Sequence, residues 1–484
     1  MSDGAITSGP PAAPRHIVVV GGGISGLAAA WFLHRDGPAD LRVTVLEGSP
    51  QIGGKLRVSE VAGVPVDEGA ESLLLRRPEA VDLAVAVGLG DDLEDAATSS
   101  ASIWSRGQMR PLPTGTVMGI PTDLRALART GLLSARELAR VPADSWLPGQ
   151  PLSGDVAVGK HVARRMGHAI VERLVEPLLG GVYAGRADLL SLEATMPQLV
   201  APARRHRSLL AAAREARANA DGADASVFAA PRASVFGAPR GGVGRLPAAV
   251  ARASAATVRT GATVRELART PTGWALTIGS TRAPERLEAD AVILAVPPTA
   301  AARLLRDTVP AAAAELSVVR SASMAIITLA FPRTAFRSPP RGSGFLVPPA
   351  DGRVIKAVTF SSTKWGWYAD AAPATVVVRL SVGRLDEEGD LQRDNPELVE
   401  FALAELTDAI GVIDPPVDAR VSRWGGGLPQ YAVGHLGRVQ RVRAAVAAQP
   451  GLAVCGATYD GVGIPACVAS AQSAAGQVLR QWST

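Results

Sequence analysis

Three features of the sequence predict an α/β fold in which both ends of the chain build one domain. A strand, a glycine-rich turn and a helix run from 16 to 35, and a second strand follows at 41–46. Another glycine-rich junction between a strand and a helix lies close to the C-terminus, at 452–464. Between these two ends, short strands alternate with helical stretches. We therefore expect a Rossmann-type nucleotide-binding unit joined to a mixed-sheet, substrate-binding middle with a helical lobe.

The remaining elements follow from periodicity and from turn residues. A hairpin is predicted at 102–112 around Arg106 and Gly107. Further helices are predicted at 78–89, across most of 121–195, at 395–410 and at 464–481. Further strands are predicted at 262–267, 274–278, 289–294, 323–331, 354–360, 374–382 and 452–455. Residues 1–14 have the composition of a disordered leader, and residues 221–237 that of a linker.

Charge and cysteine content exclude several classes of protein. The 484 residues carry 50 Lys and Arg against 45 Asp and Glu, and this excess is too small to predict nucleic-acid binding. Two cysteines, Cys455 and Cys467, cannot build a disulfide framework or a cysteine metal site, so we expect a reducing cytoplasm. The uncharged stretch 17–33 is interrupted by glycines and is marginal in length for a membrane span, so at most peripheral membrane contact is expected.

The first glycine-rich turn has the spacing of a dinucleotide-binding site. The pattern G-x-G-x-x-G is matched by Gly21, Gly22, Gly23, Ile24, Ser25 and Gly26. The turn follows a strand, opens a helix and precedes Glu47 at the end of the next strand, which is the context that the motif requires. The helix N-terminus would bind a pyrophosphate, and Glu47 would accept hydrogen bonds from ribose hydroxyls. The alternative is a tight turn that binds nothing.

Three more segments indicate which dinucleotide is bound. A second glycine pair comes at Gly53, Gly54, Lys55 and Leu56; a following segment comprises Gly69, Ala70, Glu71 and Ser72; and a C-terminal motif includes Gly456, Val462, Gly463 and Ile464. These segments resemble those of the glutathione-reductase-like FAD proteins, especially the amine oxidase group. NAD dehydrogenases lack them, so the resemblance implies FAD.

The resemblance also implies a division of the chain into domains. The FAD-binding Rossmann domain would combine residues 15–100, 238–300 and 415–484. The substrate domain would combine 101–220, which includes the helical lobe, with 301–414. The leader at 1–14 and the linker at 221–237 would lie outside both domains.

Four segments narrow the family further. They lie at 176–185, 359–365, 428–435 and 460–467, and together they resemble protoporphyrinogen/coproporphyrinogen III oxidases of the HemY type. With the N-terminal motifs, the likeness runs from about residue 16 to 480 except for the linker. The chain departs from the family at Ala70, where many relatives have Pro, and at Arg77, where at least some have Lys. The change at Arg77 keeps the charge but alters its geometry.

The resemblance places four more residues at the site. Val264 and Trp424 would contact the flavin, whereas Arg77 and Val182 would contact the substrate, with the Arg77 guanidinium gripping a propionate. The plainer alternatives are a solvated helix cap for Arg77, core packing for Val182 and interdomain packing for Trp424. His435 fits a structural histidine bonded to a nearby loop better than a base. The sequence nominates no catalytic residue and contains no metal motif.

The implied reaction is the oxygen-dependent oxidation of coproporphyrinogen III to coproporphyrin III in heme biosynthesis, by hydride transfer to FAD with hydrogen peroxide as by-product. Protoporphyrinogen IX is the alternative substrate. A covalent-FAD amine oxidase is disfavoured because residues 428–431 contain no cysteine, and a carotenoid desaturase because 176–185 fits the porphyrinogen family better. A non-enzymatic FAD-fold binder is disfavoured because the flavin motifs are intact. The implied partners are the porphyrinogen, dioxygen and, transiently, a ferrochelatase, with the chain a monomer or homodimer.

Overall fold

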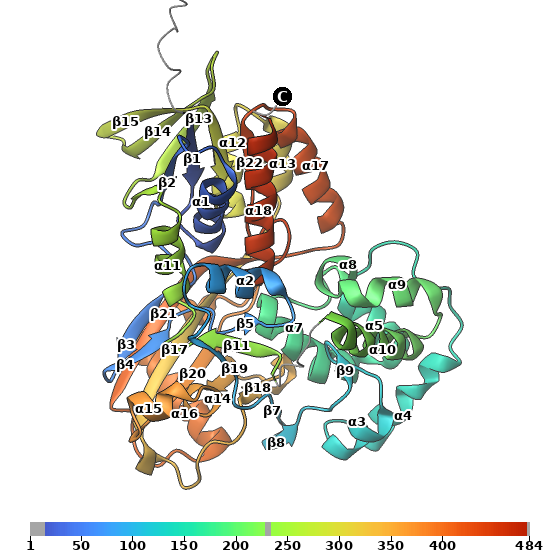
Figure 1. The fold of residues 1–484 in the computed structure, drawn as a ribbon. Coiled ribbons are helices and arrows are strands. Elements are labelled where there is room, and N and C mark those ends of the chain that lie inside the picture. The colour runs from blue at the N-terminus through green and yellow to red at the C-terminus, as the bar shows by residue number, and fades with distance from the viewer. Residues whose placement is uncertain (1–14, 228–233, 482–484) are drawn as a thin grey trace, which may run out of the picture.

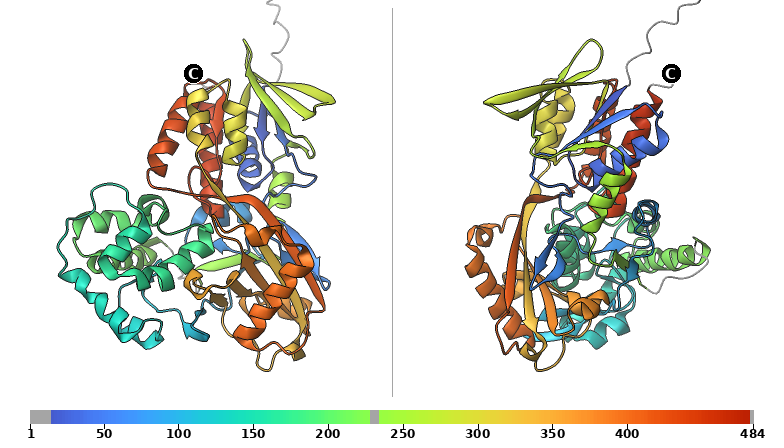
Figure 2. Two further views of the ribbon diagram at one scale, coloured as in Figure 1. Left: turned by 180° about the vertical axis from the view of Figure 1, so that it is seen from behind. Right: turned by 60° about the vertical axis from the view of Figure 1, so that its left-hand side comes forward.

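The computed structural model describes residues 15–227 and 234–481 and shows a mixed α/β molecule in three parts (Figure 1). A parallel sheet with its helices lies at one end, a larger mixed sheet lies at the other, and a helical lobe lies beside them (Figure 2). The predicted leader at 1–14 falls outside the described residues. Across the described ranges, no helix is long and apolar enough to cross a membrane.

The parallel sheet combines strands from distant parts of the chain. Its order is β12 (Thr257–Arg259), β2 (Arg42–Leu46), β1 (His16–Val20), β16 (Ala291–Leu294) and β22 (Leu452–Val454). Every neighbouring pair is parallel, and β1 is buried on both faces, as a central parallel strand requires. Helices α1 (Ile24–Asp36) and α18 (Ile464–Arg480) pack on one face. The other face is covered by α12 (Pro298–Leu305), α13 (Pro310–Ser317), α17 (His435–Ala447) and the hairpins of β13 (Val264–Arg269), β14 (Trp274–Ser280) and β15 (Ala283–Ala289).

The second sheet has seven strands and is mostly antiparallel. Its order is β21 (Asp418–Pro429), β17 (Ser321–Pro332), β20 (Thr375–Val382), β19 (Ile355–Phe360), β18 (Gly344–Leu346), β7 (Ala101–Ser105) and β8 (Gln108–Pro111). Alternate residues of β17, β20 and β19 form a core with helix α16 (Asn395–Ile410). The opposite face of the sheet is turned toward the parallel-sheet domain at one end and toward the helical lobe at the other.

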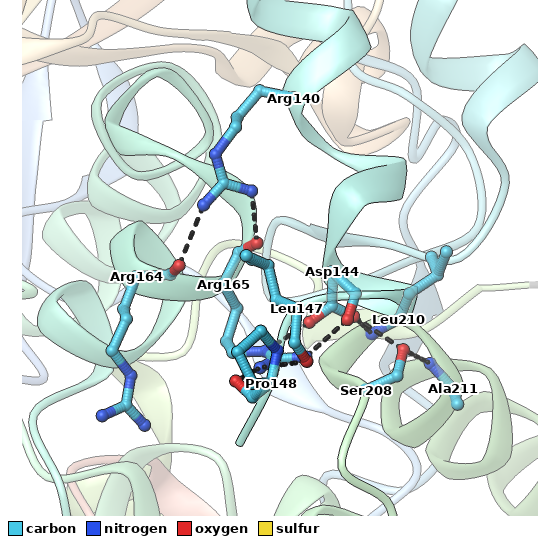
Figure 3. A network of polar contacts seen from close by, with 9 residues as sticks. All are labelled: Arg140, Asp144, Leu147, Pro148, Arg164, Arg165, Ser208, Leu210 and Ala211. Atoms are coloured by element: carbon cyan, nitrogen blue, oxygen red, sulfur yellow. Dashed lines mark hydrogen bonds and ion pairs between the residues drawn. The ribbon is translucent and has the colours of Figure 1, made fainter.

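A buried ion pair ties the helical lobe together (Figure 3). The lobe contains α3 (Leu124–Thr130), α4 (Ala135–Arg140), α5 (Val158–Met166), α7 (Glu176–Tyr183), α9 (Pro197–Arg205) and α10 (Leu209–Val227). Arg165 on α5 pairs with the fully buried Asp144 at 2.5 Å. Asp144 also accepts hydrogen bonds from the Ser208 hydroxyl at 2.6 Å and the Leu210 N–H at 2.8 Å. Three chain segments are therefore joined by one carboxylate.

The structure corrects three sequence expectations. The linker at 221–237 is shorter than predicted, because α10 continues to Val227 and β11 (Phe236–Pro239) pairs with β5 (Leu73–Leu74) and β6 (Leu93–Asp95). Residues 228–233 lie outside the described ranges. The boundary at 415 is wrong, because β21 belongs to the seven-stranded sheet. Within the stretch predicted as mostly helical at 121–195, residues 158–183 form several short segments, which include a π-helical turn at Val171–Val175. The other domain boundaries stay a prediction.

Candidate active site

The first glycine-rich turn needs glycine at two positions for steric reasons. Gly21 has a φ of +111°, and a Cβ there would lie 2.4 Å from the Ala295 carbonyl oxygen. A Cβ on Gly26 would lie 1.8 Å from the Gly21 carbonyl oxygen. Both contacts are impossible, so these residues allow the turn and the close approach of helix α1 to the sheet.

A side chain on Gly23 would meet no such contact within the protein, so the glycine at this position has a different function. The atom nearest to a Cβ built on Gly23 is the Gly54 Cα, at 3.9 Å. The second glycine pair lies alongside, because the Gly53 N–H donates to the Gly22 carbonyl at 2.8 Å. Gly23 is also the N-cap of α1, and no side chain caps that helix. Glycine here leaves room for another molecule to reach the exposed N–H groups at the helix start.

Glu47 is held at the rim of this turn. Its Oε2 accepts the Gly22 N–H at 2.7 Å, and its Oε1 accepts the Ser49 N–H at 2.8 Å. Glu47 is half-buried, so each oxygen keeps a lone pair that can accept from a ribose hydroxyl. Ile24 and Ser25, the first residues of α1, are both buried and fix the helix against the sheet.

The next cluster joins three predicted cofactor residues on separate elements. The Lys55 carbonyl accepts the Ala70 N–H at 3.3 Å, and a Cβ on Gly69 would lie 2.2 Å from that carbonyl oxygen. The same Cβ would lie 3.3 Å from the Trp424 ring, whose indole N–H donates to the Glu68 carbonyl at 3.0 Å. Lys55 is an exposed residue, yet surrounding protein desolvates its ammonium and lowers its pKa. A Cβ on Gly427 of β21 would lie 3.7 Å from the Lys55 Cε, whereas Leu56 is buried.

The C-terminal motif meets the N-terminal turn. Gly456 has a φ of +119°, and a Cβ there would lie 3.6 Å from the Ser25 hydroxyl oxygen. The exposed Gly463 is the N-cap of α18, followed by the buried Ile464, and Val462 packs against the helical-lobe core. The starts of two helices, α1 and α18, are thus brought to one place from opposite ends of the chain. Such a pair suits a long ligand that has a phosphate part and a polar ring part.

One face of the seven-stranded sheet lies next to these segments. Trp424 on β21 is paired with Met324 on β17, so both side chains lie on the face opposite the α16 core. On the neighbouring strands, that face carries Ser381 of β20, its partner Ala357 of β19, and Leu346 of β18, which is paired with Ala357. All five are partly exposed. We call this stretch the open face.

Helix α7 borders the open face. A Cβ on Gly181 would lie 3.5 Å from Leu346, and Gly181 is exposed. Val182 is 44% exposed, which is high for a valine and contradicts the core-packing alternative. The structure therefore brings helix α7 next to the open face, and a substrate contact by Val182 stays a prediction.

Comparisons with known proteins agree with this geometry. Residues 24–479 match the flavin containing amine oxidoreductase family. The chain belongs to this family. As a member it is an FAD-dependent oxidoreductase, and the glycine turns described above fit that cofactor in shape. Solved amine oxidases of low sequence identity have the same fold as this chain. One is cyclohexylamine oxidase from Brevibacterium oxydans IH-35A, which has a TM-score of 0.67 and 15% identity and covers 97% of this chain and 100% of its own.

Three proteins with 32–39% identity to this chain are named or described as porphyrinogen oxidases. A coproporphyrinogen III oxidase from Mycobacterium tuberculosis (strain H37Rv) is 39% identical over 96% of this chain and 98% of its own length. A coproporphyrinogen III oxidase from Bacillus subtilis (strain 168) is 32% identical with the same coverage. A solved structure from Exiguobacterium sp. 255-15, described as a candidate protoporphyrinogen oxidase, has a TM-score of 0.83, 33% identity, and coverage of 96% of this chain and 99% of that one.

In this flavoprotein, Glu71 is committed to a task that the sequence did not predict. Its buried carboxylate pairs with Arg379 at 2.7 Å and lies 3.8 Å from Lys364. It also accepts the Ser361 hydroxyl at 2.7 Å and the Trp365 indole N–H at 2.9 Å. Burial alone would raise the pKa of Glu71, but these partners outweigh it and lower the pKa to about 2. The side chain thus joins segments far apart in the chain, and a contact between the Glu71 backbone and FAD stays a prediction.

The same two cations hold the backbone and side chain on either side of Glu71. Arg379 donates to the Gly69 carbonyl at 2.5 Å, and Lys364 donates to the Ser72 hydroxyl at 2.7 Å. Lys364 also lies 4.9 Å over the Trp365 ring in a cation–π contact. One overlooked signal for Arg379 is its charge inside the otherwise apolar strand predicted at 374–382.

Arg77 and Val264 are engaged by other residues of the protein. Arg77 is the N-cap of α2 (Pro78–Ala86) and is exposed, and its guanidinium pairs with Glu79. This local pairing matches the helix-cap alternative, so a substrate contact by Arg77 stays a prediction. Val264 is buried on β13, and its carbonyl accepts the Arg303 guanidinium at 3.0 Å.

His435 has the structural role that the sequence favoured. Its Nε2 lies 3.0 Å from the Thr458 carbonyl oxygen, and its ring stacks on Tyr431 with 4.3 Å between ring centres. Burial lowers the pKa of His435 to about 4, so the ring is neutral at pH 7. The Tyr431 hydroxyl donates to the Ala457 carbonyl. These contacts hold the loop between β22 and α18.

A hollow of about 790 Å³ lies elsewhere on the surface. It is lined by α12, α13, the start of β17 and the Gly425–Gly426 segment of β21. None of its lining residues belongs to the Gly21–Gly26 turn or to α7. We therefore place the site by the convergence of the glycine segments and the open face, not by the size of this hollow.

Proposed function

We propose that this protein oxidises coproporphyrinogen III to coproporphyrin III, with dioxygen as the final electron acceptor and hydrogen peroxide as by-product. One observation carries the proposal: the chain is 39% identical, over nearly its full length, to a coproporphyrinogen III oxidase, against 26% to the protoporphyrinogen oxidase of Bos taurus. Protoporphyrinogen IX is the second candidate substrate. The cytoplasmic location, the transient ferrochelatase contact and the oligomeric state stay predictions.

The proposed cofactor contacts follow the glutathione-reductase-like arrangement. The Gly21–Gly26 turn and the start of α1 would hold the pyrophosphate, and Glu47 would hold a ribose. The backbone of Val264 would lie beside the adenine. The ring of the flavin would be bordered by Gly53, Gly54, Lys55, Leu56, Gly69, Ala70, Ser72, Trp424, Gly456, Val462, Gly463 and Ile464. When bound, FAD supplies the two-electron acceptor for the reaction.

The protein itself would mainly position the substrate and exclude water. The open face, which runs from Trp424 on β21 to Leu346 on β18, would offer a largely apolar surface beside the flavin segments. Forming the aromatic porphyrin releases pyrrole N–H protons, and these can pass to solvent without a protein base. This agrees with the neutral, loop-bound state of His435.

The proposal is tested by a side-by-side oxidation assay. Both porphyrinogens are offered to the purified protein, with porphyrin fluorescence and peroxide followed together and a Gly23→Val variant as the flavin-free control. We expect the higher kcat/KM for coproporphyrinogen III. A tenfold preference for protoporphyrinogen IX, about 1.4 kcal/mol in transition-state binding, would overturn the substrate and keep the family. Activity on neither would reopen the amine oxidase and desaturase alternatives.

A further inference from the structure

Lys356 is a buried cation that none of the roles above uses. It is 3% exposed and lies in a β-bulge of β19, where Ile355 is paired with Val382 and Ala357 with Ser381. Its ammonium donates to the Gly383 carbonyl at 2.8 Å. Among the described residues, no carboxylate forms an ion pair with it. A buried charge without a counter-ion is costly, and such groups occur where a ligand supplies the missing charge.

The register of the sheet places this ammonium at the edge of the open face. Arg379 and Ser381 point to the same face of β20 because they are two residues apart, and Gly383 follows two residues further on. Gly383 lies against β17, since a Cβ on it would be 3.1 Å from the Met324 Cα. The Lys356 ammonium is therefore bound at Gly383, the residue that lies against Met324, and Lys356 precedes the partly exposed Ala357 in the chain.

The separation from the cofactor segments fits a large substrate. Arg379 contacts Gly69, and Gly383 is four residues further along, which is roughly 13 Å in a strand. A tetrapyrrole lying on the open face with its reacting carbon near the flavin would extend its peripheral side chains over this range. The carboxylate of a propionate could then reach the bulge at Lys356.

The surroundings of this ammonium lower its pKa. Burial and the neighbouring Arg384 lower the pKa of Lys356 to about 7. Arg384 is held by the carbonyls of Val347 and Arg353, and the acidic groups near it are Glu387, Glu176 and Glu405. An incoming carboxylate would face two cations, of which Lys356 has N–H groups left to donate.

We propose that Lys356 is a substrate-binding residue that anchors one propionate carboxylate of the porphyrinogen at the far end of the open face. The inference rests on the proposed function and adds a specificity-determining contact to it. A substrate whose side chain at this place is a vinyl group would leave the ammonium unpaired and would bind less well.

The test compares Lys356→Met and Lys356→Arg, with Lys160→Met on the exposed surface of α5 as the matched control. Binding of coproporphyrin III and of its tetramethyl ester is measured by fluorescence. We expect Lys356→Met to weaken binding of the acid by roughly tenfold or more, the usual effect of losing a charge-assisted hydrogen bond, and to leave the ester unchanged. Lys356→Arg should restore much of the affinity, and Lys160→Met should match the wild type.

Kinetics separate this inference from the function. KM for coproporphyrinogen III should rise in Lys356→Met while kcat and the flavin spectrum stay close to wild type. A folded Lys356→Met variant with unchanged KM and unchanged binding would overturn the anchor but not the function, whereas a wild type that oxidises no porphyrinogen would overturn the function.

If Lys356→Met does not fold, the pH dependence of binding to the wild-type protein tests the inference instead. Its affinity for coproporphyrin III should fall as pH rises above about 7, whereas the affinity for the ester should not change. An affinity for the acid that stays constant across this range would overturn the anchor.

Discussion

The cofactor end of the site and its proposed substrate end differ in whether backbone or side chains form them. The cofactor end uses backbone: Gly21, Gly23 and Gly26 shape a turn, and the starts of α1 and α18 present N–H groups. The proposed substrate end would use side chains brought together by tertiary packing, such as Lys356 in its bulge and Val182 on helix α7. Backbone sites leave a local pattern in the sequence, whereas sites assembled across strands do not.

The largest expected effect separates two glycines of one motif. Gly26→Val places a side chain on the Gly21 carbonyl, so we expect a loss of more than about 3 kcal/mol of stability or no folded protein. Gly23→Val places its side chain in open space, so the protein should fold within about 1 kcal/mol of wild type and lose FAD. Thermal unfolding and the flavin-to-protein absorbance ratio measure both. A Gly23→Val protein that retains FAD would contradict the proposed pyrophosphate contact.

The next effect tests the junction between the two ends. Glu71→Gln removes the charge that pairs with Arg379 and Lys364 inside the protein, and breaking a buried pair in this way costs about 3–5 kcal/mol. Urea unfolding should show that loss, with weaker FAD retention because Gly69 and Ser72 lose their support. Glu285→Gln breaks the exposed pair with Arg259 and serves as the control, with little change in stability expected because solvent screens this pair. Equal effects of the two changes would contradict a cross-domain role for Glu71.

A pH-dependent effect of intermediate size is expected at Asp67. Burial raises the pKa of this carboxyl to about 7, despite hydrogen bonds from the Val243 and Gly244 N–H groups. A raised folded-state pKa adds stability that is complete below the unfolded pKa of about 4 and is lost as pH rises through about 7. Between these values, the melting temperature of Asp67→Asn should fall less with pH than that of wild type. Parallel profiles for the two proteins would show that Asp67 does not titrate there.

The smallest effect is expected at Arg77. This guanidinium is exposed and already paired with Glu79, so Arg77→Glu should change stability by less than about 1 kcal/mol. Its local pairing leads us to expect little change in KM for the porphyrinogen. A tenfold rise in KM with normal FAD content would instead place Arg77 at the substrate and extend the substrate end to helix α2.

The sequence predicted the elements that carry strong local signals. The β1–α1–β2 unit, the hairpin turning at Arg106 and Gly107, and helix α16 have nearly the expected bounds. The twelve-residue strand β21 and helix α17 were not predicted. β21 begins with charged residues and carries three glycines before its final Leu and Pro, a pattern that is unusual for a strand. Its place in the seven-stranded sheet depends on pairing with β17, about a hundred residues earlier, which no local pattern records.

The candidate site divides in the same way. The first glycine turn could be predicted from motif spacing, because backbone geometry constrains it, whereas Trp424 came from the family resemblance and its flavin contact stays a prediction. The roles of Arg379 and Lys356 could not, because each acts through a partner far away in the chain, Glu71 for the first and the open face for the second. The one usable signal was a charged residue inside an otherwise apolar strand, where burial without a partner would be costly.

The most direct test of the central claim follows the flavin during the reaction. The purified, yellow protein is mixed with coproporphyrinogen III in the absence of oxygen, and visible flavin absorbance and porphyrin fluorescence are recorded together. We expect the flavin absorbance to bleach as porphyrin fluorescence grows, and to return with peroxide when oxygen is admitted. A colourless protein that cannot be reconstituted with FAD, or a flavin that stays oxidised in the presence of coproporphyrinogen III, would contradict the proposed function.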